Sequence, residues 1–138
     1  MKQVLSIEQM KHLQELGLDT SDASMYWARV SHGSRIDDKS KGKWFLSLHK
    51  EFQTCGFMSY ESISTYTLQD ILDKLPCFIG NQVLTIQKLA DSYTCLYIEP
   101  YTRSMINITE SKEPIDAAYD MLCWCIENGY VKVVMEEK

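Results

Sequence analysis

The sequence predicts an α+β fold with three helices and an antiparallel sheet of about five strands, in the order α-β-β-α-β-β-β-α. Three observations predict it. Apolar residues recur at helical spacing in segments that begin with a capping residue. Other short segments alternate apolar and polar residues, which is typical of strands with one packed and one wet face. The 138 residues have the length of a single domain, expected over residues 1–138, whose helices pack mainly on one face of the sheet.

A first helix is predicted over residues 7–16. Ser6 and Gln9 have the spacing of a capping box, in which each side chain bonds the backbone N–H of the other residue. Gly17 suits the left-handed conformation that commonly ends a helix. The apolar stripe that would face the core consists of Ile7, Met10, Leu13 and Leu16.

Two strands are predicted after this helix, over residues 24–30 and 44–52, because both segments are rich in aromatic and β-compatible residues. The polar, glycine-containing segment between them, residues 31–43, is expected to form a long, mobile hairpin loop. Residues 53–66 have no clear periodicity, and we expect an irregular connection there.

A second helix is predicted between Thr67 and Pro76. Thr67 caps it, and Asp70 stands three residues later, where an acidic side chain also interacts favourably with the helix dipole. Pro76 cannot continue a helix, so the helix should end before it. The apolar stripe of this helix consists of Leu68, Ile71, Leu72 and Leu75.

Three further strands should follow, over residues 82–89, 93–99 and 104–109. In the last of them Ile106 and Ile108 alternate with polar residues, and we expect the isoleucines to lie on the packed face of the sheet.

The last helix is predicted from Pro114 to Asn128, with Gly129 just beyond its end. Residues 130–135 are compatible with a short edge strand.

Cys123 and Cys125 flank Trp124 in this last helix. Because successive residues of a helix are rotated by about 100°, the two sulfur atoms lie about 200° apart and should neither share a metal ion nor form a disulfide. Trp124 projects away from the core face together with Met121, so the helix is apolar around most of its circumference. Such a helix is either buried on two sides, with Trp124 packed under the first helix or the 53–66 connection, or exposes a patch that binds a partner.

The composition argues against several classes of protein. With 14 basic and 19 acidic residues the net charge is −5, which gives no overall attraction to nucleic acid. No apolar run reaches the ~18–20 residues of a membrane span, and the first residues lack the apolar segment of a secretion signal. The cysteines are odd in number and irregularly spaced, so we expect free thiols in a reducing cytoplasm. They are Cys55, Cys77, Cys95, Cys123 and Cys125.

No catalytic residue, cofactor-binding loop or metal site is predicted. The six glycines are scattered, and none of the three histidines has a metal-ligand spacing to another histidine or to a cysteine. One alternative is an enzyme that uses Cys55 or Cys77 as its nucleophile, with His49 as a base for Cys55. No local signature supports that alternative.

A second alternative is nucleic-acid binding through residues 31–44. Trp44, at the end of this loop, has a ring that could stack on a base. Asp37 and Asp38 interrupt the basic residues, however, so a solvated loop is the simpler interpretation. The basic residues are Arg35, Lys39, Lys41 and Lys43.

Two segments, YTLQDILDKLP and DAAYDMLCWCIENGY, resemble a family of small proteins without an assigned activity, which are encoded by gut anaerobes and by the phages and other mobile elements that infect them. In that family a Thr-Leu-Gln-Asp helix ending in Leu-Pro precedes a β-meander, and a Leu-Cys-Trp-Cys helix closes the domain. The resemblance covers about residues 64–131, and residues 6–30 are also similar. It implies a phage-related α+β protein and assigns no functional residue.

We therefore expect a non-enzymatic protein-interaction module of a phage or mobile element, located in the cytoplasm. A surplus of aromatic residues and the lack of a catalytic constellation favour contacts with a protein partner or with a second copy of the chain. No cofactor, metal or membrane partner is expected, and nucleic acid is the less favoured partner. The candidate interface consists of Trp124, Met121, Trp27 and Tyr97.

Overall fold

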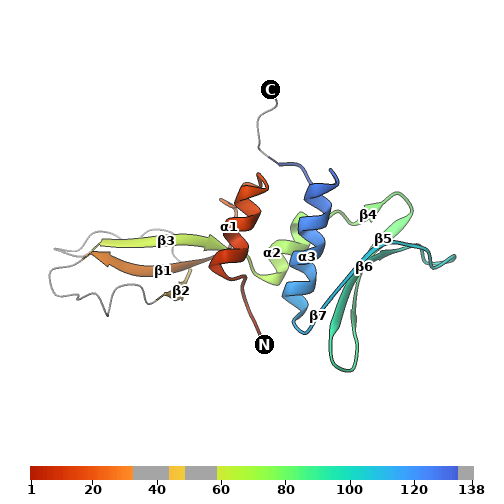
Figure 1. Ribbon diagram of the computed structural model, residues 1–138, viewed down its shortest axis with the longest axis horizontal. Coiled ribbons are helices and arrows are strands. Elements are labelled where there is room, and N and C mark those ends of the chain that lie inside the picture. Colours follow the sequence, from red (N-terminus) through yellow and green to blue (C-terminus); the bar gives the residue numbers. More distant parts are fainter. Residues whose placement is uncertain (33–43, 49–58, 134–138) are drawn as a thin grey trace.

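The computed structural model describes residues 1–32, 44–48 and 59–133. Within these ranges it confirms the predicted α+β class, with three helices and two antiparallel sheets (Figure 1). The helices are α1 (Ile7–Glu15), α2 (Leu68–Lys74) and α3 (Pro114–Glu127). The strands are β1 (Met25–His32), β2 (Phe45–Ser47), β3 (Ser59–Thr65), β4 (Phe78–Ile79), β5 (Gln82–Lys88), β6 (Tyr93–Ile98) and β7 (Met105–Ser111). No helix in the described ranges is both long enough and apolar enough to cross a membrane.

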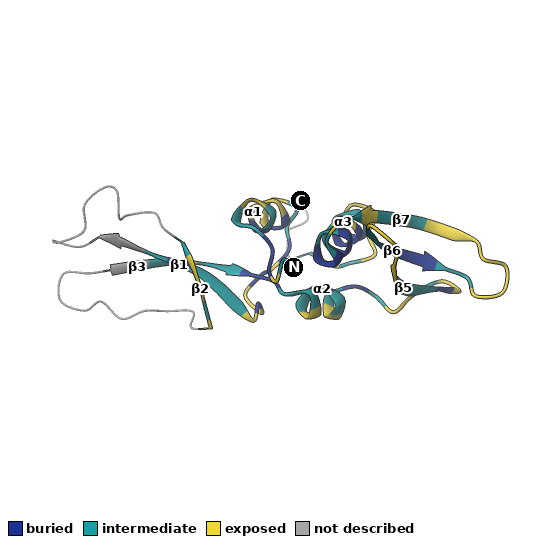
Figure 2. Ribbon diagram, turned by 90° about the horizontal axis from the view of Figure 1, so that it is seen from below, coloured by how far each residue is buried: buried dark blue, intermediate teal, exposed yellow. Residues whose placement is uncertain are grey.

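The sequence predicts one sheet of about five strands, whereas the described residues form two sheets with seven strands in total. The three-stranded sheet has the order β2-β1-β3, and the four-stranded sheet has the order β4-β5-β6-β7. The two sheets lie at opposite ends of the molecule, with the helices between them in both views (Figures 1 and 2). Alternation within a strand does not show which strands pair, so the sequence could not separate the two sheets.

Both predicted capping boxes are present at the starts of α1 and α2. Ser6 Oγ accepts from the backbone N–H of Gln9 at 3.1 Å, and Gln9 Oε1 accepts from the N–H of Ser6 at 2.9 Å. Thr67 and Asp70 exchange the same pair of hydrogen bonds, at 3.2 and 3.0 Å. Burial raises the pKa of Asp70, but hydrogen bonds from Ser24 and Thr67 outweigh it and hold that pKa below its ordinary value. Local side-chain chemistry therefore sets where both helices begin.

The N-terminal segment before α1 is attached to both parts of the fold. The carbonyl oxygen of Leu5 accepts hydrogen bonds from Trp27 Nε1 at 2.9 Å and from Thr65 Oγ1 at 2.7 Å, both in the three-stranded sheet. Lys2 Nζ donates to Asp116 Oδ1 in the first turn of α3 at 2.8 Å. This segment therefore links the three-stranded sheet to the helix that carries the core.

The hydrophobic core is centred on α3, whose buried side chains meet those of α1, α2 and β6 in one cluster (Figure 2). The fully buried side chains of α3 include Ile115, Ala118, Met121, Leu122 and Cys125. The facing elements contribute Met10, Leu13, Ile71, Cys95 and Tyr97. α3 covers one face of the four-stranded sheet through β6 and β7.

Three segments differ from the prediction. Residues 59–65, predicted as part of an irregular connection, form β3 and pair with β1. The sequence SYESIST is mostly polar, so its strand structure follows from backbone pairing that periodicity does not reveal. β4 has only two residues, too few for a periodic signal. Residues 130–133 form no strand. Most of the predicted 31–43 loop, the end of the predicted 44–52 strand and the last residues of the chain lie outside the described residues.

Candidate functional site

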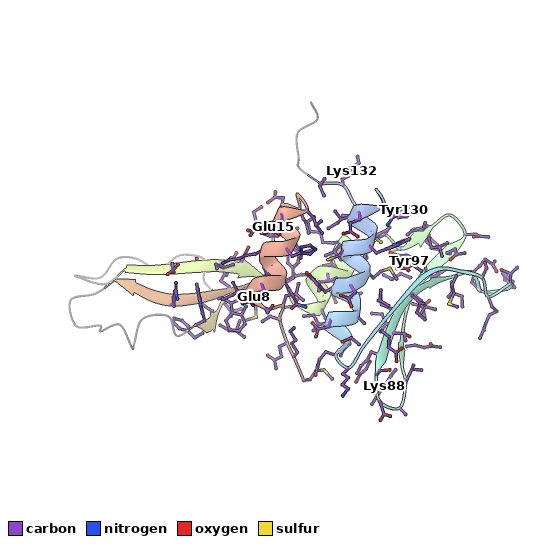
Figure 3. The ribbon with its side chains drawn as sticks, viewed as in Figure 1. Glu8, Glu15, Lys88, Tyr97, Tyr130 and Lys132 are labelled. Carbon is purple, nitrogen blue, oxygen red and sulfur yellow. The ribbon has the colours of Figure 1, made fainter. Side chains whose placement is uncertain are left out.

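Two of the four residues of the predicted interface, Tyr97 and Met121, are fully buried. The hydroxyl of Tyr97 donates to the carbonyl oxygen of Pro76 at 2.7 Å, and burial raises the pKa of Tyr97 above its ordinary value. Met121 Sδ accepts from Asn107 Nδ2 at 3.6 Å. Tyr97 lies beside α3 (Figure 3). A partner cannot reach either side chain in this fold, so neither residue belongs to an exposed surface.

Trp124 is half-buried and packs against the core cluster. Its ring stacks on the ring of Tyr130, with centroids 5.4 Å apart and 26° between the ring planes. Tyr130 lies at the C-terminal end of α3 (Figure 3). The ring that covers part of Trp124 therefore belongs to Tyr130, just beyond the end of α3. Helical angles alone do not reveal this contact.

Three of the described cysteines have thiols with suppressed acidity. Burial raises the pKa of Cys95 to about 12 and those of Cys123 and Cys125 to about 11. Cys123 interacts with the hydroxyl of Tyr119. Cys125 interacts with the hydroxyl of Tyr97, so the two helical cysteines have different neighbours. Because the thiolate is the nucleophile, none of these three thiols is activated for catalysis.

Of the two predicted nucleophiles, only Cys77 lies in the described part of the chain, where it is an exposed free thiol. Cys55 and its suggested base His49 lie outside the described residues. Among the residues that the structure describes, no group of three or more His, Cys, Asp or Glu side chains is placed to hold a metal ion. The basic residues of the predicted nucleic-acid loop also lie outside the described ranges; they are Arg35, Lys39, Lys41 and Lys43.

Trp27 and Trp44, which the sequence suggested for different functions, lie on the same face of the three-stranded sheet. The β1–β2 register pairs Trp27 with Leu46, which places Trp44 opposite Arg29. The guanidinium carbon of Arg29 lies 4.5 Å from the ring centroid of Trp44. Arg29 Nε donates to Glu61 Oε1 on β3 at 2.7 Å. Trp44, just before β2, therefore forms a row across the sheet with Arg29 of β1 and Glu61 of β3.

The two indole rings and the start of α1 line a pocket of about 470 Å³, which we call the tryptophan pocket. Lys11 and Arg29 bring positive charges to its wall, and Glu8 brings a negative charge. Glu8 lies on α1 beside the three-stranded sheet (Figure 3). The lining residues are Ser6, Ile7, Glu8, Lys11, Trp27, Arg29 and Trp44.

A neighbouring pocket has a volume of about 500 Å³ and is lined by residues of α1, β1, β3 and the segment that follows α1. Most of its lining side chains carry hydroxyl or amide groups. Several of these groups bond one another. Gln14 Nε2 donates to Thr20 Oγ1 at 3.1 Å, and Thr20 Oγ1 lies 3.0 Å from Ser64 Oγ. The tryptophan pocket, with its two aromatic rings, is the better candidate for a ligand site.

β7 turns its polar side toward the core. Asn107 Nδ2 donates to a sulfur atom of α3 at 3.6 Å, and Thr109 Oγ1 donates to a main-chain carbonyl of α3 at 2.7 Å. Ile106 and Ile108 lie on the other side and are 38% and 49% exposed. The prediction that these isoleucines face the core is therefore wrong, because α3 meets β7 through hydrogen bonds from Asn107 and Thr109.

β7 is also an edge strand of the described sheet, since among the residues that the structure describes it pairs with β6 alone. Alternate N–H and C=O groups of an edge strand point away from its sheet. The strand contains no proline, lysine or arginine, which are the residues that commonly protect an edge. Its start is held by Gln82, whose side chain accepts from the N–H of Ile106 at 2.8 Å and donates to Ser104 Oγ at 3.2 Å. The edge thus has an ordered start, one exposed charged residue, Glu110, and an irregular register with β6 between Tyr97 and Ile98.

Searches against protein-family models, curated proteins and solved structures found no match to this chain. Its function is therefore inferred from its own residues, above all from the exposed side of β7 and from the tryptophan pocket.

Proposed function

We propose that the chain is a non-enzymatic protein-interaction module that associates with a second copy of itself through β7. The observation that carries this proposal is the orientation of the strand. Its polar side faces α3, while Ile106 and Ile108 are exposed at an edge that no further strand of the described ranges covers. An apolar edge strand of this kind favours pairing with a strand from another chain.

Antiparallel pairing of two copies of β7 about Asn107 supports a second copy as the partner. In that register Ile106 of each copy lies opposite Ile108 of the other, so the isoleucines of both copies form one apolar strip. Cross-strand pairs of this kind contribute about 0.2–1 kcal/mol each relative to alanine pairs. The free backbone groups of both edges gain hydrogen-bond partners at the same time.

The charges at the two ends of β7 are complementary in the same register. Arg103 precedes the strand and Glu110 lies near its end, so pairing brings Arg103 of each copy close to Glu110 of the other. Within the described residues Arg103 makes no ion pair, and Glu110 accepts a hydrogen bond from Ser92 Oγ. Unlike charges approach across the interface, which favours this register.

The association with a phage or mobile element and the cytoplasmic location are part of the same proposal. Support for the first is the sequence resemblance of the second and last helices. Support for the second is that the described cysteines are free thiols, which are typical of a reducing compartment.

Sedimentation velocity over a concentration series tests the self-association. The wild-type chain is expected to show a monomer–dimer equilibrium. Ile106→Lys places a charge at the pairing edge and should shift the equilibrium to the monomer. Ile86→Lys is the matched control, because Ile86 is also 38% exposed but lies on β5, which β6 separates from β7. Circular dichroism establishes that both variants are folded.

Two results would contradict the proposal. A wild-type chain that stays monomeric up to its solubility limit would exclude a second copy as the partner. Equal dissociation in the Ile86→Lys and Ile106→Lys variants would place the contact away from the β7 edge.

A further inference from the structure

The tryptophan pocket gathers groups that self-association through β7 does not use. It lies at the three-stranded sheet, at the opposite end of the molecule from β7 (Figure 1). Its volume of about 470 Å³ lies within the range of small-ligand sites, about 300–1,000 Å³. The pocket is therefore large enough for one nucleotide and independent of the proposed interface.

Both indole rings of the pocket are held in place before any ligand arrives. The Nε1–H of Trp27 is bonded to the carbonyl oxygen of Leu5 at 2.9 Å. The ring of Trp44 is covered on one side by the guanidinium of Arg29. Both rings are only half-buried, so each still presents surface to solvent. Fixed, partly exposed indole rings are suitable platforms for the flat face of another ring system.

The positive charges of the wall suit a phosphate next to that ring. Lys11 makes no ion pair with another residue in the described ranges. Arg29 bonds Glu61 through Nε, and within the same ranges no hydrogen bond engages the other guanidinium nitrogens. Both side chains can thus donate to a phosphate oxygen at the mouth of the pocket.

We propose that the tryptophan pocket binds a nucleobase together with its attached phosphate. The base stacks on the exposed surface of Trp27 or Trp44, and the phosphate accepts from Lys11 and Arg29. A cationic ligand fits less well, because Arg29 already occupies one face of Trp44 and Lys11 would repel it. The base and phosphate come either from a single-stranded nucleic acid or from a free nucleotide.

The net charge of −5 makes this binding dependent on local charge and therefore sensitive to salt. For single strands the logarithm of affinity falls by about 0.7 per contacted phosphate per logarithmic unit of salt. The one phosphate that Lys11 and Arg29 contact predicts a slope of about −0.7.

Fluorescence anisotropy of a dye-labelled oligothymidylate of about twelve nucleotides, titrated with the full chain at low salt, tests the proposal. Loss of one stacked base in Trp44→Leu should weaken binding by about fivefold to 150-fold. Trp44→Tyr keeps an aromatic ring and should retain most of the affinity. Lys11→Glu should also weaken binding, whereas Lys88→Glu should not. Lys88 undergoes the same charge change on the four-stranded sheet, far from the pocket (Figure 3).

Unlabelled thymidine monophosphate identifies the source of the base. If the monophosphate displaces the labelled strand as well as an unlabelled oligothymidylate does at equal nucleotide concentration, the ligand is a free nucleotide. If only the unlabelled oligothymidylate displaces it, the ligand is a single strand. Absence of binding at low salt, or equal losses in Lys11→Glu and Lys88→Glu, would overturn the proposal. Lys11 is exposed, so its variant remains informative even if Trp44→Leu does not fold.

Discussion

The central strands of the two sheets have the same pairing but different burial. β1 and β6 each have an antiparallel neighbour on both sides. Four of the six residues of β6 are buried, whereas Ala28 is the one buried residue among the described side chains of β1, Met25–Arg29. The difference comes from α3, which packs on β6 and brings the largest group of buried apolar side chains with it.

This difference shows what a sheet relies on when little apolar surface is buried against it. The three-stranded sheet has the row of Trp44, Arg29 and Glu61 and the two hydrogen bonds to the Leu5 carbonyl. Contacts of these kinds contribute about 0.5–1 kcal/mol each at partly exposed sites. Burial of a large apolar side chain contributes about 1.5–3 kcal/mol. We therefore expect stability to be concentrated on the α3 side of the molecule.

The largest expected effect is that of Leu122→Ala in α3. Leu122 is fully buried, so the substitution should lower the free energy of unfolding by about 2–5 kcal/mol. Ile63→Ala in β3 removes a half-buried side chain and should cost about 1–2 kcal/mol. Chemical denaturation of both variants measures the difference. Equal costs would show that the two sheets are equally well packed.

Hydrogen exchange tests the same comparison without substitution. Paired amides of β6 should exchange only when the whole chain unfolds, whereas paired amides of β1 should exchange through a smaller opening at lower free energy. Mass spectrometry of peptides that contain Leu96 or Ala28 separates the two strands. If both peptides exchange at the same rate, the sheets unfold as one unit.

A smaller effect is expected for Arg29→Met, which removes the charge from the row across the three-stranded sheet. The ion pair with Glu61 is partly exposed, so its loss together with the contact to Trp44 should cost about 1 kcal/mol or less. The cost should shrink at high salt. A double-mutant cycle with Glu61→Gln measures the coupling, and a salt-independent cost above that size would mean that this row is a major source of stability.

The smallest effect is expected in the loop between β6 and β7. Arg103 has a φ of 66°, a left-handed conformation that is unfavourable for residues with a Cβ. Arg103→Gly should stabilise the monomer by roughly 0.5 kcal/mol, because relief of this strain exceeds the added flexibility of the unfolded chain. Thermal unfolding in the Ile106→Lys background keeps self-association out of the measurement. A lower Tm would indicate that the arginine side chain makes a stabilising contact.

The helices were predictable because their signals are local. Ser6, Thr67 and Pro76 act on neighbours a few residues away, so their spacing alone locates the ends of helices. Which strands pair, and which face of a strand is buried, are not determined locally. Ile106 and Ile108 correctly predict a strand, but which side faces α3 depends on residues that are distant in the sequence.

The candidate sites were predictable only in part for the same reason. Trp27 was predicted for a protein interface and Trp44 for stacking on a base, but their shared pocket depends on the β1–β2 register. Tyr97 and Met121 were assigned to a surface because a sequence with many aromatic and apolar residues does not show which of them are buried in the core. The edge position of β7 follows from sheet order, which no single segment encodes.

The ion pair between Lys2 and Asp116 joins residues that are 114 positions apart. During translation Lys2 leaves the ribosome long before Asp116 has been added, so the first segment must wait for α3 to be made. Until then Leu5 and the two strands that donate hydrogen bonds to it, β1 and β3, lack the last of the three helices between the sheets. The nascent chain is therefore expected to stay open until α3 has been synthesised.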